Sequence, residues 1–418
     1  MPPGHLLTPA DAARTILARV SPLAATRVRL ADAAGRVLAR AVTSPVDIPP
    51  WNSSAMDGYA ARNEDLAARP SGMALRVIES IPAGAFPRKK PGPGECVRIF
   101  TGAPVPDGCG TVIRQEDTTP LDGGRVRIDS LRDAGKNVRR RGEDIGRGTR
   151  VLEAGTALGP AQVGVLASIG EATVAAYRRP VVAFLATGDE IVDLDQRAAI
   201  RAGRKIASSN SYTLQALITE AGGEPLNLGI ARDDPKDIQR RLARAKGVDL
   251  VLTTAGVSVG EHDHVRGVLD RMGLALEFWR IRMRPGAPVG FGLLGKRPWI
   301  GLPGNPVSTM VTFELFVRPA LRKLLGHRGL FRRTRGVQVR EAIPLGPTLQ
   351  HFLRVTLTEE SGALVAELTG SQSSGVLTSM AKADALLIVG EDRKRVYKGE
   401  TLPAIRLDET EYVEEVPY

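Results

Sequence analysis

Cysteine and aromatic residues are both scarce in this chain of 418 residues. There are two cysteines, Cys96 and Cys109, and phenylalanine, tryptophan and tyrosine together make up 4% of the sequence. Two cysteines cannot build a disulfide framework, and neither lies in a metal-ligand spacing, so we expect small buried residues in a reducing cytoplasm. So few aromatic rings also leave no obvious platforms for stacking the bases of a nucleic acid.

Long apolar runs and a secretion signal are absent as well. No stretch reaches the roughly 18 apolar residues that a membrane-spanning helix needs. The N-terminal segment has no basic start followed by an apolar block, and Thr8 and Pro9 instead predict the capped beginning of a helix. We therefore expect a cytoplasmic protein with no membrane partner.

Positive charge, in contrast, is plentiful, with a net charge of +11. The excess is spread along the chain, which argues against a nucleic-acid partner. The densest basic cluster lies in the segment 137–144, where Arg139, Arg140 and Arg141 stand beside two acidic residues. This cluster is either a solvated turn or a rim that attracts a polyanionic small molecule.

The pattern of predicted elements divides the chain into regions. Residues 1–50 and 146–178 predict helices, a short strand and turns. Residues 51–145 show short β-branched runs between glycine- and proline-rich turns, which is typical of a small β-rich module. Residues 327–418 return to short strands and predict a second β-domain.

The region 179–326 differs because apolar strands alternate with capped helices. Its strands, such as 181–187 and 250–254, are nearly continuous apolar runs. This pattern predicts a three-layer α/β sandwich, in which ligands bind beyond the carboxyl ends of the strands.

The most informative segment, 250–263, joins such a strand to a glycine-rich loop. Gly256, Ser258 and Gly260 would leave backbone N–H groups free to point at an anion. Glu261 and Asp263 follow, and could hold a divalent cation against the same anion. A glycine turn without function is the alternative for this segment alone.

Other strand ends in this region carry charged and polar residues. The carboxylates are Asp189, Glu190, Asp233, Glu261 and Asp263, the guanidiniums are Arg280, Arg282 and Arg284, and the turn residues are Pro303, Gly304, Asn305 and Ser308. Asp234 is interpreted as a helix start. The mixture indicates a cleft shared by a negatively charged substrate and a hard cation.

Eight motifs in a fixed order make the interpretation specific. They are SAMDGYA (54–60), IFTGAPVP (99–106), NVRRRGED (137–144), TGDEI (187–191), GIARDDP, AGVSVGEHD, MRPGAP and GLPGNPVS. In these motifs the chain resembles, from end to end, the molybdopterin molybdenumtransferase family, whose relatives include the E-domain of gephyrin.

The resemblance implies an elongated, multidomain α/β plus β subunit. It implies a connecting helical/β domain (1–50 and 146–178), an inserted β-rich domain (51–145), a central three-layer α/β molybdopterin-binding domain (179–326) and a C-terminal β-barrel (327–418). It further implies a homodimer, whose cleft is lined by the α/β and C-terminal domains of one subunit and the inserted domain of its partner.

The implied reaction joins molybdate to adenylylated molybdopterin, with Mg²⁺ as cofactor, and releases AMP. By motif, the catalytic set is Asp57, Thr101, Asp144, Glu190, Asp233 and Asp263, of which Glu190, Asp233 and Asp263 would bind Mg²⁺. The substrate-binding set is Arg139, Gly256, Ser258, Gly260, Arg280, Arg284, Pro303, Gly304, Asn305, Ser308, Arg354 and Ser374. Transient contacts with the molybdopterin adenylyltransferase and with cofactor-accepting apoenzymes are also implied.

Four residues depart from the family pattern. Arg280 and Arg284 replace the usual lysines, Ala287 replaces a lysine, and Ala255 replaces a glycine. These changes leave open a paralogue with a different oxyanion preference, such as tungstate. A scaffold protein that has lost its chemistry is a second alternative, and a pterin adenylyltransferase is a third, although that enzyme needs only the α/β domain.

Overall fold

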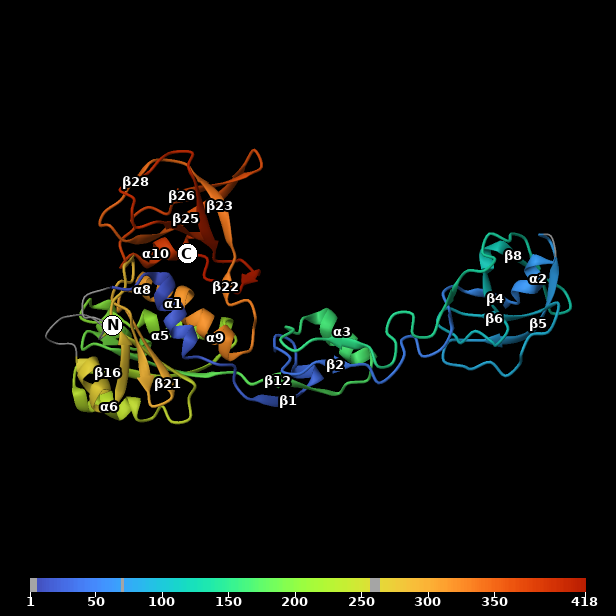
Figure 1. Cartoon of the computed structure of the whole chain (residues 1–418), viewed down its shortest axis with the longest axis horizontal. Helices are drawn as coiled ribbons and strands as arrows, with labels where there is room; N and C mark the ends of the chain where they lie inside the picture. Colours follow the sequence, from blue (N-terminus) through green and yellow to red (C-terminus); the bar gives the residue numbers. More distant parts are fainter. Residues whose placement is uncertain (1–5, 69–70, 256–263) are drawn as a thin grey trace. The chain divides into compact units, whose positions relative to one another are not determined.

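The computed structural model describes residues 6–68, 71–255 and 264–418, which belong to two compact units (Figure 1). The major unit contains Met1–Arg27, Gly35–Ala39 and Ala175–Tyr418, and the minor unit contains Val28–Ala34 and Arg40–Val174. The chain passes between them within β1 (Ala25–Arg29), at both ends of the segment Gly35–Ala39, and within β12 (Thr173–Tyr177). Among the described helices, none combines the length and apolar character needed to cross a bilayer.

A six-stranded sheet forms the centre of the major unit. Its strand order is β16 (Glu224–Ala231), β13 (Val181–Thr187), β17 (Leu250–Thr254), β21 (Arg297–Leu302), β20 (Gly290–Leu294) and β18 (Leu274–Phe278). The first four strands are parallel, whereas β20 and β18 are antiparallel to their neighbours. The carboxyl ends of four parallel strands therefore meet at one edge, as the sequence predicts.

Helices cover both faces of this sheet, because side chains along each strand alternate between two cores. Val182 and Phe184 enter a core with α1 (Pro9–Ala18), α5 (Ser209–Glu220), α8 (Pro306–Thr312) and α9 (Arg318–Leu324). Ala183 and Leu185 enter a separate core with α6 (Pro235–Leu242) and α7 (His264–Arg271). The predicted three-layer α/β sandwich is confirmed.

The predicted caps explain where two of these helices begin. The hydroxyl of Thr8 accepts a hydrogen bond from the N–H of Asp11 at 3.1 Å, and Pro9 occupies the first turn of α1. Asp234 accepts hydrogen bonds from the N–H groups of Lys236 and Asp237, both at 3.2 Å, at the start of α6. Both contacts satisfy N–H groups that have no partner within the helix.

A closed β-barrel completes the major unit. Its strands are β19 (Met283–Arg284), β25 (Gln350–Glu360), β26 (Ala363–Leu368), β23 (Thr334–Val339), β29 (Thr401–Arg406) and β27 (Ala385–Val389), and pairing of β25 with β27 closes the sheet. Val337, Leu353 and Leu387 contribute to the barrel interior. This barrel confirms the C-terminal fold that the resemblance implies.

The segment 278–283 is divided between the two sheets. Its run of mostly apolar and basic residues predicts a single strand, but Phe278 ends β18 and Met283 begins β19, which pairs with β25 of the barrel. Between them the N–H of Ile281 donates to the carbonyl of Ala287 at 3.0 Å, which closes a turn. The turn carries Arg284 away from the central sheet and toward the barrel.

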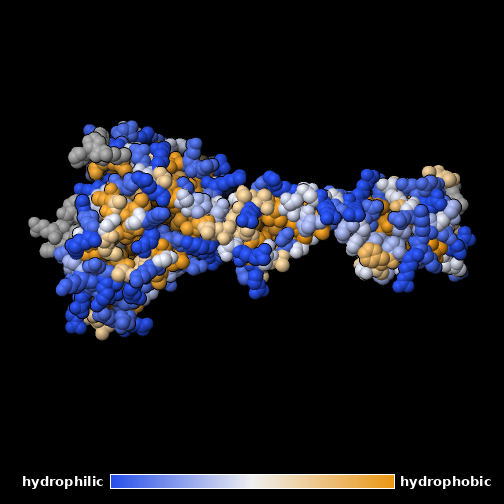
Figure 2. Space-filling model, turned by 60° about the horizontal axis from the view of Figure 1, so that its bottom comes forward, coloured by the Kyte–Doolittle hydropathy of each residue, from blue (hydrophilic) through white to orange (hydrophobic). Residues whose placement is uncertain are grey.

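The minor unit is built around a second six-stranded sheet. Its order is β7 (Thr111–Arg114), β4 (Gly58–Ala61), β6 (Glu95–Ile99), β5 (Ala74–Ile81), β9 (Arg125–Ile128) and β8 (Thr118–Leu121). Small apolar patches lie among hydrophilic side chains on the surface of this sheet region (Figure 2). The unit also contains α2 (Asn63–Ala67), α3 (Pro160–Ser168) and the short strand pairs β2 (Val42–Thr43) with β11 (Arg150–Leu152) and β3 (Ser53–Ser54) with β10 (Val138–Arg139).

Both cysteines lie in the minor unit as free thiols. Cys96 is buried and Cys109 is half-buried. Burial raises the pKa of each thiol to about 12, so both thiols are protonated at neutral pH. Neither thiol has the thiolate character of a nucleophile.

Candidate functional site

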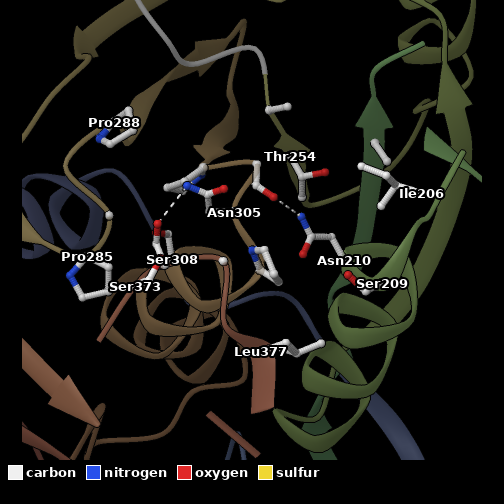
Figure 3. A pocket seen from close by; sticks show the side chains of 18 of the residues that line it. Ile206, Ser209, Asn210, Thr254, Pro285, Pro288, Asn305, Ser308, Ser373 and Leu377 are labelled. Atoms are coloured by element: carbon white, nitrogen blue, oxygen red, sulfur yellow. Dashed lines mark hydrogen bonds between the residues drawn. The ribbon is translucent and has the colours of Figure 1, made fainter. Parts of the chain in front are cut away.

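A pocket of about 1150 Å³ lies in the major unit, where the carboxyl ends of the parallel strands meet the barrel. Figure 3 shows Pro285, Ser308 and Ser373 on one side of the pocket and Ile206, Ser209 and Asn210 on the other. Thr254 and Asn305 lie between them. Seven of the residues predicted to bind substrate or metal line this pocket: Glu190, Arg284, Pro303, Gly304, Asn305, Ser308 and Ser374.

Two arginines lie at one side of the pocket, of which Arg284 lines it and Arg354 is buried next to its lining residue Ser373. Arg284 lines the pocket from β19, opposite His351 on β25. Arg354 lies three residues further along β25 and is 1% exposed. Its guanidinium donates to the carbonyls of Ser371 and Ser373 at 3.2 and 3.1 Å and to the hydroxyl of Ser379 at 3.2 Å.

Within the described residues, neither Arg284 nor Arg354 forms an ion pair with a carboxylate. Burial, followed by the repulsion of Arg284, lowers the pKa of Arg354 to about 10. Arg354 is still a cation at neutral pH. Two like charges held near each other without a counter-charge favour an anionic ligand.

Hydroxyl and amide groups extend the same side of the pocket. The side chain of Asn305 donates to the hydroxyl of Ser374 at 2.9 Å, and the N–H of Val307 donates to the carbonyl of Ser374 at 3.2 Å. Ser308, which is 4% exposed, lines the pocket from α8. These contacts hold the segment 372–375 of the barrel domain against the turn after β21.

Carboxylates cluster at the ends of β13 and β16. The N–H of Asp189 donates to Asp233 at 3.3 Å, and the N–H of Asp233 donates back to Asp189 at 3.3 Å. Glu190 lines the pocket, and its carboxylate lies so close to Gly188 that a Cβ there would be 2.7 Å from Oε1. Gly188 also has a φ of 136°, so only glycine fits this strand end.

The oxygen-rich donor set at this strand end has the chemistry that Mg²⁺ prefers. Among the described residues, no three histidine, cysteine, aspartate or glutamate side chains come together as a metal site. Of the predicted metal ligands, Glu190 and Asp233 are described, whereas Asp263 lies outside the described residues. The predicted anion-binding residues Gly256, Ser258 and Gly260 also lie outside them.

Ala255, the last described residue before that segment, lies on the pocket wall in a strained backbone conformation. Its φ is 66°, and its N–H donates to the carbonyl of Leu302 at 3.2 Å. The left-handed region disfavours residues that carry a Cβ. A Cβ at Gly304 would lie 3.2 Å from the Ala255 methyl group, so the two turns pass close together.

Sequence reasoning missed the polar residues on the opposite side of the pocket. Ser208, Ser209 and Asn210 line it from the start of α5, and the amide of Asn210 donates to the carbonyl of Gly304 at 2.8 Å. Their signal is the sequence SSNS at 208–211, which is typical of a helix cap and does not by itself indicate a ligand site. Gln372 and Ser373 were missed as well, because the sequence did not indicate that this barrel segment meets the turn after β21.

Arg280 is not among the pocket residues. It is exposed and follows the end of β18. Arg354 also does not line the pocket directly, but it bonds to the carbonyl of Ser373, which does.

The remaining predicted residues belong to the minor unit. Thr101 donates to Oδ1 of Asp57 through its N–H at 2.8 Å and its hydroxyl at 2.7 Å. These hydrogen bonds, the backbone one first, lower the pKa of Asp57. Gly58 continues the chain into β4, where a Cβ would lie 1.9 Å from the carbonyl oxygen of Ile113. Asp57 is therefore an exposed, ionised carboxylate on a tightly fixed strand start.

Arg139 and Asp144 flank the same part of the minor unit. Arg139 pairs with Ser53 where β10 meets β3, and its side chain is exposed. The N–H of Asp144 donates to the carbonyl of Ile48 at 3.0 Å, and its side chain is exposed as well. The motifs around Asp57, Thr101 and Arg139 thus come together in this unit.

Three family models match consecutive parts of the chain. Residues 7–170 match the MoeA N-terminal region (domain I and II), residues 183–323 match a probable molybdopterin binding domain, and residues 337–407 match the MoeA C-terminal region (domain IV).

Whole-length relatives give the same assignment. The chain is 34% identical to the molybdopterin molybdenumtransferase of Haemophilus influenzae over 90% of this chain and 92% of the relative, and 36% identical to that of Nostoc over 91% and 88%. The crystal structure of the molybdopterin biosynthesis moeA protein from Pyrococcus horikoshii matches with a TM-score of 0.80 and 29% identity, covering 96% of this chain and 99% of that one. The chain belongs to the molybdopterin molybdenumtransferase family.

Proposed function

We propose that this protein is a molybdopterin molybdenumtransferase, which inserts molybdate into adenylylated molybdopterin and releases AMP. The observation that carries the proposal is a pocket lined by Arg284, Ser308 and Ser374, with Arg354 bonded to the lining residue Ser373; neither arginine pairs with a carboxylate among the residues that the structure describes. Molybdate is a tetrahedral dianion, and guanidinium and hydroxyl donors suit its oxygens.

In this proposal the two arginines and two serines hold molybdate close to the pterin. The buried position of Arg354 strengthens its attraction to the dianion, because little water screens it. Arginine stays protonated through the reaction, so Arg284 and Arg354 position and neutralise the oxyanion rather than transfer protons. Arg280 would add positive charge near the pocket, and Arg139 would add it at the entry rim that the family resemblance implies.

The carboxylates are proposed to serve the nucleotide end of the substrate. Glu190, Asp233 and Asp263 would hold Mg²⁺, which when bound neutralises phosphate charge and polarises a phosphoryl oxygen. The amides of Gly256, Ser258 and Gly260 and the turn of Pro303, Gly304 and Asn305 would orient the phosphates. In the proposed dimer, the ionised Asp57, with Thr101 and Asp144, would complete the polar set from the inserted domain of the partner subunit.

Assembly, partners and location are part of the same proposal. The protein would act as a cytoplasmic homodimer, and it would contact the molybdopterin adenylyltransferase and cofactor-accepting apoenzymes transiently. The scarcity of cysteine supports the reducing compartment. Sedimentation of the purified chain tests the dimer, and a monomer at micromolar concentration would contradict it.

Release of AMP tests the proposed reaction. Purified protein is incubated with adenylylated molybdopterin and Mg²⁺, with molybdate, with tungstate or without oxyanion. We expect AMP release that depends on molybdate and on Mg²⁺, and no AMP with either oxyanion would refute the enzyme. Ala287 lines the pocket at a position where a lysine would add charge. Faster AMP release with tungstate than with molybdate would identify the protein as a paralogue with an altered oxyanion preference.

The Asp263→Asn variant separates the metal site from the fold. We expect it to abolish AMP release while the thermal unfolding midpoint and the oligomeric state stay as in the wild type. Asp122→Asn, in an exposed turn of the minor unit, is the matched control and should release AMP normally. Wild-type turnover in Asp263→Asn would remove this residue from the mechanism.

A further inference from the structure

The minor unit carries an aromatic pair, formed by the half-buried Trp51 and the exposed Phe86, that has no part in the chemistry described above. The rings of Trp51 and Phe86 meet edge to face with their centroids 4.9 Å apart, and 60% of Phe86 is exposed. A single exposed apolar residue is ordinary on a protein surface. A pair of contacting rings is less ordinary in this chain, because it has so few aromatic residues.

The pair lies beside Asp57 and Thr101. The indole N–H of Trp51 donates to the carbonyl of Gly102 at 3.5 Å, and Gly102 directly follows Thr101. The N–H of Gly102 donates to the carbonyl of Ser54 at 2.8 Å, three residues before Asp57. The aromatic rings and the carboxylate of Asp57 therefore belong to one surface.

Guanidiniums border the same surface. Arg139 pairs with Ser53, and the N–H of Arg141 donates to the side chain of Asn52 at 2.9 Å, so both are anchored on the residues that follow Trp51. Arg141 forms an ion pair with Asp47 at 2.6 Å. Arg139 and Arg140 are exposed and form no ion pair with any residue that the structure describes.

Partly exposed rings on the same surface as unpaired guanidiniums match the two ends of a nucleotide. Aromatic faces stack on a base, and guanidiniums bind a phosphate. An apolar partner would leave the guanidiniums without counter-charge, and a bare oxyanion would leave the rings in water. Charge complementarity together with the rings therefore selects a planar anion.

We propose that Trp51 and Phe86 form a stacking platform for the adenine of AMP, the product of the proposed reaction, with Arg139 and Arg140 binding its phosphate. The proposal rests on the proposed function, because that reaction releases AMP. It assigns Trp51 and Phe86 as specificity-determining residues for the nucleotide.

Binding of AMP to the full-length protein tests the platform. Equilibrium dialysis with labelled AMP compares the wild type with Trp51→Leu, Phe86→Ala and Trp51→Phe. We expect AMP affinity to fall about tenfold in the first two variants, within the range for a base stacked on one aromatic side chain, and to stay within about twofold in Trp51→Phe. Ribose 5-phosphate, which has no base, should compete at least tenfold more weakly than AMP.

The controls separate stacking from stability and from the reaction. Tyr397→Ala removes another exposed aromatic residue, which is 65% exposed in the major unit, and should leave AMP binding unchanged. Thermal unfolding midpoints identify any variant that fails to fold. Wild-type AMP affinity in folded Trp51→Leu and Phe86→Ala, or no saturable AMP binding to the wild type, would overturn the platform. Molybdate-dependent AMP release in the same wild-type preparation would show that the proposed function stands regardless.

Discussion

Arg318 and Arg354 are both buried arginines of the major unit, 3% and 1% exposed, but their surroundings differ. Nε of Arg318 donates to Glu314 at 2.6 Å, and its NH2 lies 3.1 Å from Glu220. Arg354 bonds to two carbonyls and a hydroxyl instead, and the positive charge of Arg284 repels it. The first arginine lies in the helical core, and the second lies beside the pocket.

The pKa values of the two guanidiniums move in opposite directions for this reason. Burial lowers both, but the carboxylates of Glu314 and Glu220 outweigh it and raise the pKa of Arg318. Burial and Arg284 lower that of Arg354 to about 10. A carboxylate partner neutralises a buried cation within the fold. A buried cation without such a partner can instead attract an anionic ligand.

The largest effect expected from this comparison is on stability. Arg318→Met should reduce the free energy of unfolding by about 3 kcal/mol, because it leaves Glu314 and Glu220 with Arg332 as their remaining buried partner. Chemical denaturation followed by circular dichroism measures it. Arg354→Met is the matched control and should lose clearly less, since no buried carboxylate loses its partner. An equal loss in both variants would contradict the distinction.

The second effect is on activity, and it should appear when Arg354 is replaced. Arg354→Met should slow molybdate-dependent AMP release by about 100-fold or more, as removal of one preorganised oxyanion donor does in other enzymes. Steady-state assays at saturating pterin substrate measure it. Arg354→Lys, which restores a charge without the planar fork, should recover only part of the rate. A wild-type rate of AMP release in Arg354→Met would contradict the assignment of Arg354 as an oxyanion donor.

A smaller effect tests whether additional positive charge in the pocket strengthens molybdate binding. Ala287→Lys adds a cation on the pocket wall beside Pro285 and Pro288. We expect the half-saturating molybdate concentration to fall by up to about fivefold, which corresponds to about 1 kcal/mol for a partly exposed charge pair. An unchanged concentration would mean that Arg284 and Arg354 already supply the positive charge that molybdate binding needs.

The smallest effect extends the comparison to carboxylates of the minor unit. Asp133 is buried and pairs with Arg114 at 2.8 Å, whereas Asp57 is exposed and bonds to Thr101. Thr101→Val removes one donor, so the pKa of Asp57 should rise toward its ordinary value of about 3.9. Carboxyl NMR titration measures it, and the pKa of Asp133 should not move.

The sign of the associated pH dependence follows from the lowered pKa of Asp57. Its contribution to stability is fully present above about pH 4, the ordinary aspartate value, and is lost as the pH falls through the lower folded-state value. Thr119→Val, which removes a hydroxyl donor from Asp129, is the matched control and should leave the pKa of Asp57 unchanged. A response of Asp57 to that change would show that the assignment to Thr101 is wrong.

The sequence predicted the central sheet well because its signals are local. The apolar strand 181–187 and the cap at Asp234 each act within a few residues, and the structure has both. The meeting of Glu190, Asp233 and the turn 303–305 at one edge then follows from parallel strands. These parts of the candidate site could therefore be located from periodicity and caps alone.

The contribution of the barrel could not be located in this way. The contact between Asn305 and Ser374 joins residues 69 positions apart, and the pairing of Arg284 with His351 depends on a two-residue strand. Neither leaves a periodic signal in the sequence. Asn210 was missed because a polar residue in the first turn of a helix is usually a cap, and here its amide reaches Gly304 instead.

Binding of molybdate alone tests the central claim most directly. Calorimetric titration of the wild type should show one saturable site per chain, with binding lost in Arg354→Met and retained in a folded Arg318→Lys variant. The same affinity for molybdate in Arg354→Met as in the wild type would contradict the claim that these unpaired arginines form the oxyanion site.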